Sequence, residues 1–163
     1  MFGFQCKKSN SNNDNGLPPA TETGQGVFAC RINGEPWISK RGRPDMAIYY
    51  SHDTLTIRGT TSENSIYESF ILSLVGTYNI TKQVYEFNDT SKAFVLYLKY
   101  GIDPCFTRGP YGNVERRLTG GALSITKVDT LQKFFSGTFR FDVPTDFCDI
   151  LKITDGRFDI KYQ

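Results

Sequence analysis

The stretch VFACRINGEPW, residues 27–37, decides the fold class of this chain. Its first part alternates with the two-residue period of a strand, so that Phe28, Cys30 and Ile32 share one face. Asn33-Gly34 follows directly, and this dipeptide signals a two-residue hairpin turn because both positions tolerate positive φ. The stretch therefore predicts two antiparallel strands joined by a tight turn.

The turn also predicts which residues of the hairpin face one another. Counting outward from Asn33-Gly34 pairs Cys30 with Trp37. Because Cys30 lies on the inward face, we expect the Trp37 side chain to be buried across from it. Pro36 cannot donate a hydrogen bond to a neighbouring strand, so the second strand is short or lies at a sheet edge.

The two-residue period continues along the chain, and no segment shows a sustained helical period. Alternating stretches fall at residues 46–50, 54–60, 66–75, 93–100, 119–128 and 133–143. Residues 66–75 are apolar on both faces, which is typical of a central strand. Within 93–100, one face carries Phe94, Leu96, Leu98 and Tyr100. The sequence predicts an all-β fold, an antiparallel β-sandwich or flattened barrel of about 8–10 strands with a meander in its C-terminal half.

The C-terminal stretch DILKITDGRFDIKY changes phase midway. Ile153 has one parity, whereas Phe158 and Ile160 have the other, so an uninterrupted strand would expose one set. Either a bulge with Gly156 at positive φ or a hairpin turn at Asp155-Gly156 restores burial. We favour the bulge, because the preceding strand is long enough to need a long partner.

Residues 1–26 differ in composition from the rest of the chain. Cys6 follows an apolar start and precedes two lysines, and residues 9–26 are rich in Ser, Asn, Asp, Gly and Pro. The junction resembles the start of bacterial lipoproteins, whose mature chain begins with an acylated Cys, although Gln5 and Gly3 depart from the usual pattern. We expect a lipoprotein N-terminus and flexible tether over 1–26 and a single all-β domain over 27–163.

Two stretches resemble a family of β-rich lipoproteins of Bacteroidota. They are LPPATETGQGVFACRINGEPW near the start, and GGALSITKVDTLQKFFSGTFRFDV with ITDGRFDIKY near the end. The resemblance implies a secreted, lipid-anchored, all-β domain, and it carries no established activity or catalytic residues.

Charge and hydropathy limit the partners. The 19 basic and 17 acidic residues are scattered, without the basic cluster that nucleic-acid binding needs, so we expect no nucleic-acid partner. No apolar run reaches about 18 residues, so no spanning helix is expected. The expected membrane contact is the lipid anchor at Cys6.

The cysteines predict one disulfide. If Cys6 is acylated, Cys30, Cys105 and Cys148 remain. In a meander, alternate connections lie at the same end of a sheet, which brings the loops holding Cys105 and Cys148 together. Cys30 lies within a strand on a core face. We expect a Cys105–Cys148 disulfide and a free, buried Cys30; the alternative is three reduced thiols.

Residues that could carry catalysis are sparse. His52, the one histidine, falls in a turn without a nucleophile motif. Glu68 lies on an otherwise apolar face, but glycosidase chemistry needs two facing carboxylates. Asp142, Asp146 and Asp149 surround a loop without the spacing of a calcium site. We expect no enzyme activity, no metal site and no cofactor.

Residues 101–117 form an unusually long connection between expected strands. Aromatic and Arg side chains on such a loop suit a glycan, an acidic partner or another protein. The candidate binding residues are Phe106, Arg108, Tyr111, Arg116 and Arg117. The alternative is a surface loop that covers the end of a sheet.

Two turns, Asp53-Thr54-Leu55 and Asp129-Thr130-Leu131, resemble the sites at which envelope proteins of Bacteroidota are O-glycosylated. The sequence as a whole favours a lipid-anchored cell-envelope domain, an outer-membrane lipoprotein, that binds a partner or has a structural role. The alternative is a carrier of small apolar ligands with a lipocalin-like cavity. A cavity lined by Phe and Tyr favours the carrier, and a filled core favours the interaction module.

Overall fold

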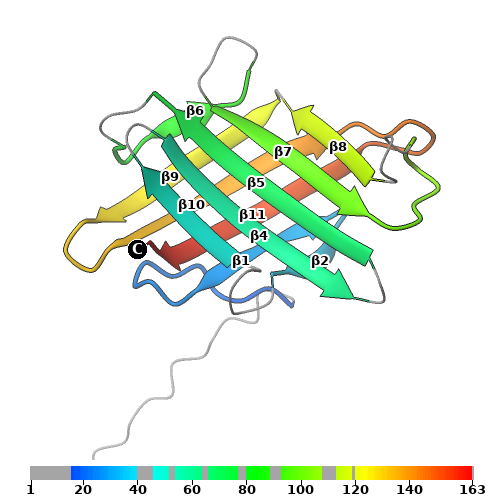
Figure 1. Ribbon diagram of the computed structural model, residues 1–163. Coiled ribbons are helices and arrows are strands. Elements are labelled where there is room, and N and C mark those ends of the chain that lie inside the picture. Colours follow the sequence, from blue (N-terminus) through cyan, green and yellow to red (C-terminus); the bar gives the residue numbers. More distant parts are fainter. Residues whose placement is uncertain are drawn as a thin grey trace, which may run out of the picture.

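The computed structural model describes residues 16–39, 46–51, 54–63, 66–76, 80–88, 93–107, 113–118 and 120–162. These residues form two packed antiparallel sheets, a β-sandwich (Figure 1). The six-stranded sheet has the order β2 (Glu35–Ile38), β1 (Val27–Ile32), β11 (Leu151–Lys161), β10 (Phe134–Val143), β9 (Gly121–Asp129), β6 (Val84–Glu86). The five-stranded sheet has the order β3 (Met46–Ser51), β4 (Thr54–Glu63), β5 (Ile66–Val75), β7 (Ala93–Tyr100), β8 (Asn113–Leu118). The all-β prediction is confirmed, and the sandwich is the correct alternative.

The N-terminal hairpin has the predicted register. Cys30 is opposite Trp37 in the β1–β2 pair, and Asn33 and Gly34 both have positive φ. Trp37 is 8% exposed and Cys30 is fully buried. The predicted meander also forms, because β9, β10 and β11 are consecutive neighbours.

One expected strand pairing is wrong. Residues 93–100 were expected to lead through a long loop to a strand at 119–128, but β8 intervenes and pairs with β7. The chain then changes sheets, and β9 pairs with β10 and β6. Residues 113–118, NVERRL, carry three consecutive charged residues, so their pattern was that of a loop rather than a strand.

The phase change in β11 is a bulge, as expected. The strand is continuous from Leu151 to Lys161, and its register with β10 shifts between Phe139 and Phe141. The residue with positive φ is Asp155 rather than Gly156. Gly156 is needed for space, because a Cβ there would lie 2.4 Å from the carbonyl oxygen of Phe139.

Aromatic rings fill the interior between the sheets. The Phe70 ring lies 4.9 Å from Trp37, 5.2 Å from Tyr97 and 5.5 Å from Phe141, centroid to centroid. These side chains come from both sheets and are at most 8% exposed. The described core therefore has ring contacts where a lipocalin-like carrier would need open space.

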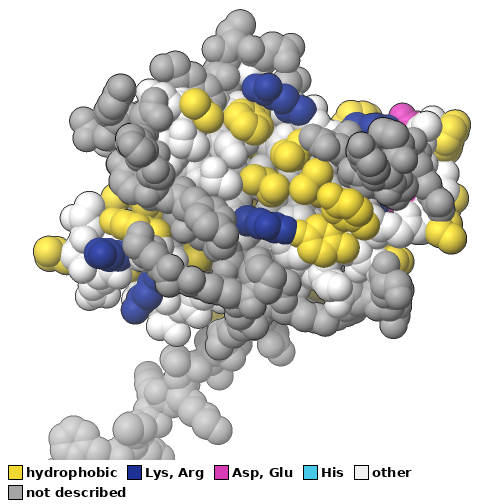
Figure 2. All heavy atoms as spheres, in the orientation of Figure 1, with side chains coloured by type: hydrophobic (Ala, Val, Ile, Leu, Met, Phe, Trp, Pro, Cys, Tyr) yellow, Lys and Arg dark blue, Asp and Glu magenta, His cyan; other side chains and the backbone are white. Residues whose placement is uncertain are grey.

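Strand β7 is apolar on both faces. Its inward residues Val95 and Tyr97 are fully buried. Its outward residues, Phe94, Leu96, Leu98 and Tyr100, lie on the outer face of the sheet. Figure 2 shows hydrophobic side chains gathered on this face over β5 and β7. An antiparallel strand with one solvated face usually alternates apolar and polar residues, so this outer face is unusual.

The part of the chain before β1 contains a fixed segment. Leu17 is 6% exposed, and the Arg157 guanidinium donates to the carbonyl of Pro18 at 3.0 Å. The expected tether over residues 1–26 is therefore too long, because the described residues 16–26 pack on the sandwich. Within the described residues, no helix could cross a membrane.

Asp159 of β11 holds this segment in place. Its carboxylate accepts hydrogen bonds from Thr21 Oγ1 (2.6 Å), Ser136 Oγ (2.7 Å) and the backbone N–H groups of Thr23 (3.1 Å), Gly24 (2.8 Å) and Gln25 (2.9 Å). Burial favours the neutral acid, but these hydrogen bonds outweigh it and lower the pKa of Asp159 to about 2. We call residues 21–25 together with Asp159 the N-terminal latch.

Candidate functional site

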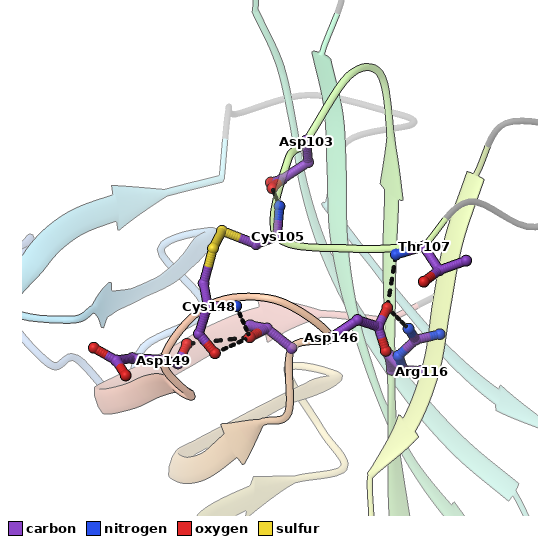
Figure 3. Close-up of polar contacts among 8 residues, drawn as sticks. Asp103, Cys105, Thr107, Arg116, Asp146, Cys148 and Asp149 are labelled. Carbon is purple, nitrogen blue, oxygen red and sulfur yellow. Dashed lines mark hydrogen bonds and ion pairs between the residues drawn. A yellow bond between two sulfur atoms is a disulfide. The ribbon is translucent and has the colours of Figure 1, made fainter.

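The predicted disulfide joins two loops at one end of the sandwich (Figure 3). Cys105 lies after β7, and Cys148 lies between β10 and β11. The carbonyl of Cys105 accepts hydrogen bonds from the backbone N–H groups of Asp146 (2.9 Å) and Phe147 (3.2 Å). Covalent and backbone bonds together fix one loop on the other, and we call residues 101–107 and 144–150 the disulfide-joined end.

Asp146 adds a charged contact between the loops. Its carboxylate accepts a hydrogen bond from Thr107 N at 2.6 Å and forms an ion pair with the Arg116 guanidinium. The Thr107 N–H and the nearby Arg116 charge lower the pKa of Asp146. The carboxylate therefore stays ionised at neutral pH, and the loops remain paired.

Short polar contacts also order each loop. The carboxylate of Asp103 accepts a hydrogen bond from the backbone N–H of Cys105 at 2.9 Å. In the other loop, the Thr145 hydroxyl accepts a hydrogen bond from the backbone N–H of Cys148 at 3.1 Å. Such side-chain caps of a turn satisfy backbone groups that no strand can pair.

A polar network connects the disulfide-joined end with the core. Lys99 Nζ lies 2.7 Å from Asp103 and 3.5 Å from Glu68. The Glu68 carboxylate also accepts hydrogen bonds from Trp37 Nε1 at 2.8 Å and Tyr97 OH at 2.6 Å. Because Trp37 belongs to one sheet and Glu68 to the other, the network spans the sandwich. Its donors occupy both oxygens of Glu68, which gives this carboxylate a structural role.

The network changes the acidity of its members. Burial, reinforced by the Glu68 charge, raises the pKa values of Tyr97 and Cys30, so both remain neutral. Burial opposes the charge on Lys99, but its bonds to Asp103 and Glu68 outweigh this effect and raise its pKa. Burial similarly opposes ionisation of Asp103, whose pKa is nevertheless lowered by Lys99 and the Cys105 N–H. The Lys99–Asp103 pair is therefore charged at neutral pH.

The candidate binding residues separate into three groups. Phe106 is only 4% exposed and its ring lies 5.8 Å from Tyr97, so it anchors the loop and cannot offer the contact surface that was expected. Arg116 and Arg117 belong to β8 rather than to a loop. Arg108 and Tyr111 lie outside the described residues, as does Cys6.

The exposed apolar residues at this end were not anticipated. The exposed fractions are 79% for Ile102, 73% for Phe147 and 50% for Ile150. A sequence signal for these exposed residues was available, since apolar residues stand within otherwise polar loops in IDPC and DFCDI. Large apolar side chains on loops fixed by a disulfide are suited to contact a partner.

The acidic residues near this end do not assemble a cation site. Among the described residues, no group of His, Cys, Asp and Glu is placed to hold a metal ion. Asp146 is paired with Arg116, and the carboxylate of Asp142 lies 4.0 Å from Lys152 Nζ. His52 lies outside the described residues.

The two turns that resemble glycosylation sites differ in how far the structure describes them. Thr130 is exposed at the β9–β10 turn, where the Asp129 carboxylate accepts hydrogen bonds from the N–H groups of Leu131 (3.1 Å) and Gln132 (2.7 Å). Asp53 of the other turn lies outside the described residues. Glycosylation of Thr54 and Thr130 stays a prediction.

Comparison with known proteins places the chain in a family. No curated protein and no solved structure matches it. Residues 24–159, which include the hairpin, the disulfide-joined end and only Gly24, Gln25 and Asp159 of the N-terminal latch, match a family model. The chain belongs to the family described as Domain of unknown function (DUF6252).

Proposed function

We propose that this protein is a lipid-anchored cell-envelope domain of the outer membrane, held by Cys6, which binds another protein through its disulfide-joined end and does no catalysis. The Cys-Lys-Lys junction and the resemblance to lipoproteins support the anchor. The disulfide supports an oxidising compartment, because such bonds persist outside the cytosol.

The observation that carries the binding role is the exposure of Ile102 and Phe147 on two loops locked by Cys105–Cys148. Loops that are already ordered lose little conformational entropy when a partner binds. A protein partner fits this end better than a glycan, because Ile102 and Ile150 offer no hydrogen bonds to sugar hydroxyls.

The anchor is tested by changing Cys6→Ser in the chain expressed with its natural upstream region. Two or more acyl chains give stable membrane attachment, so the wild type should sediment with membranes and the variant should be soluble. Mass spectrometry of the N-terminal peptide should find the acyl groups on Cys6. An unmodified Cys6, or unchanged partitioning of the variant, contradicts the anchor.

The binding end is tested with a photo-reactive residue at position 147 in cells of the source organism, with position 131 as the matched control. Leu131 is 94% exposed, but it lies in the β9–β10 turn, at the other end of β10. We expect a protein adduct of defined mass at 147 and none at 131. The purified partner should bind the wild type and bind Phe147→Ser at least about tenfold more weakly, as expected for a hot-spot residue. Equal binding of both, or a glycan adduct at 147, contradicts a protein-binding role for this end.

A further inference from the structure

The outer face of the five-stranded sheet carries apolar residues along β7. The binding role proposed for the disulfide-joined end does not account for them. Strand register places Arg58, Ile71, Leu96 and Arg117 in one row across β4, β5, β7 and β8. Neighbouring rows place Phe94 beside Ser73, Leu98 beside Ser69 and Tyr100 beside Tyr67. The apolar residues of this face therefore follow β7, with Ile71 beside them on β5, while Ser69 and Ser73 are buried between the strands. Arg58 and Arg117 lie on either side of this row.

Arg side chains lie over aromatic rings on this face, and acidic residues are sparse there. The Arg117 guanidinium lies 4.3 Å from the centre of the Phe94 ring, and that of Arg58 lies 5.8 Å from the Tyr67 ring. Outward positions of β4, β5 and β7 carry no Asp or Glu, and β8 adds Glu115 by register at the sheet edge. Among the side chains that Figure 2 colours by type, Asp and Glu are visible only at the margin of this view.

The outer face of the six-stranded sheet differs. On β10 the outward residues Thr138, Arg140 and Asp142 are exposed and alternate with buried phenylalanines. That is the ordinary pattern of a strand with one face in water. The contrast indicates that the five-stranded sheet has a partner for its outer face.

We infer that this partner is a lipid bilayer, against which the outer face of the five-stranded sheet lies with Leu96, Leu98 and Phe94 toward the acyl chains and Arg58 and Arg117 toward the headgroups. Tyr and Arg combine an apolar body with a polar end, which suits the boundary between lipid and water. Arg also attracts anionic headgroups.

The short stretch of chain between Cys6 and the sandwich supports a bilayer as the partner of this face. This argument rests on the proposed anchor at Cys6. Nine residues lie between Cys6 and Gly16, where the described structure begins, so the ten steps from Cys6 to Gly16 span at most about 36 Å when fully extended. An acylated Cys6 therefore keeps the sandwich near the bilayer. The outer face of the five-stranded sheet, with the apolar residues of β7, is suited to contact it.

The test uses the full chain with Cys6→Ser, so that no acyl chain contributes to binding. Cosedimentation with vesicles of phosphatidylethanolamine and phosphatidylglycerol should show binding that weakens at high salt, because salt screens the attraction between Arg and lipid. Leu96→Thr with Leu98→Thr keeps residues that suit a strand, and should lower the partition coefficient about tenfold or more. Val84→Thr, at an exposed position of β6, is the matched control and should bind as before.

A second pair of variants tests the headgroup contact. Arg117→Gln should weaken binding to the anionic vesicles about fivefold and should not change binding to phosphatidylcholine vesicles. Arg140→Gln, on the outer face of the other sheet, should change neither. Circular dichroism and a cooperative thermal transition establish that each variant is folded.

Three results would overturn the inference: no vesicle binding by the folded Cys6→Ser chain, equal loss of binding in Val84→Thr, or a dimer in solution that Leu96→Thr with Leu98→Thr dissociates. The last would make this face a contact between two copies of the chain. An unacylated Cys6 in the natural protein would contradict the proposed anchor and would leave the vesicle result unaffected.

Discussion

The two ends of β10 and β11 fasten distant segments in different ways. At one end, Cys105 and Cys148 join two loops covalently. At the other end, Asp159 holds residues 21–25 with hydrogen bonds alone. The disulfide should depend on redox conditions and little on pH, whereas the N-terminal latch should depend on pH and not on reductant. The disulfide-joined end should thus be most stable under oxidising conditions, and the latch should be stable wherever Asp159 is ionised.

The disulfide should make the larger contribution to stability. Its cysteines are 43 residues apart, and closing a loop of that length stabilises the folded state by about 4 kcal/mol through the entropy of the unfolded chain. We expect Cys105→Ala with Cys148→Ala to lower the free energy of unfolding by this amount in urea titrations. Wild-type protein in reductant should lose the same amount, and an undiminished stability there would contradict the assignment.

Removing the charge of the N-terminal latch should have the next largest effect. Asp159→Asn keeps the size of the side chain but places an NH₂ group among five hydrogen-bond donors. Hydrogen bonds to a charged group are stronger than neutral ones, so we expect a loss of about 3 kcal/mol in the free energy of unfolding. Asp155→Asn, on an exposed part of the same strand, is the matched control. If both variants lose the same stability, the latch is not specific to Asp159.

Acid should weaken the latch in a defined window. The pKa of Asp159 is about 2 in the folded protein, against an ordinary value of 3.8 in the unfolded chain, so its contribution to stability is present above about pH 4 and is lost as pH falls through 2. The shift corresponds to about 2 kcal/mol. The difference in unfolding free energy between wild type and Asp159→Asn should shrink over this range. A difference that is constant from pH 6 to about pH 2 would exclude ionisation as the source of the stability.

These two fastenings also show what can be predicted from the sequence. Cysteines are few, so an approximate strand order was enough to choose Cys105 and Cys148, even though β8 was not foreseen. Asp159 follows an ordinary strand alternation, and three of its donors are backbone N–H groups more than 130 residues away in sequence. Backbone donors leave no residue pattern, so no sequence signal distinguished this Asp from an exposed one.

The candidate site was predicted only in part, because the sequence indicates local contacts and not contacts between distant strands. The Asn33-Gly34 turn predicted the burial of Trp37, since local turn geometry determines hairpin register. Its hydrogen bond to Glu68 was not foreseen, because it joins two sheets whose packing depends on every strand. Phe106 was expected to offer a binding contact because it lies on the long 101–117 loop, yet it is buried next to the disulfide and its ring contacts Tyr97.

The smallest effect should come from the ion pair that accompanies the disulfide. Arg116 and Asp146 are each about one-third exposed, so solvent screens their attraction and the pair contributes little to stability. Arg116→Gln should therefore leave the free energy of unfolding of the oxidised protein nearly unchanged. Arg116→Gln should affect loop dynamics more in the reduced protein, where no covalent bond joins the two loops. Loss of several kcal/mol in the oxidised variant would mean that charge, rather than the disulfide, fixes this end.

The disulfide should fix the disulfide-joined end independently of the rest of the sandwich, and amide hydrogen exchange tests this residue by residue. The N–H groups of Asp146 and Phe147 bond to the carbonyl of Cys105, whereas those of Gly24 and Gln25 bond to Asp159. On reduction at neutral pH, exchange at 146 and 147 should accelerate by about tenfold or more, as local opening becomes easier, while exchange at 24 and 25 stays unchanged. Unchanged exchange at 146 and 147, or equal acceleration at both ends, would contradict the claim.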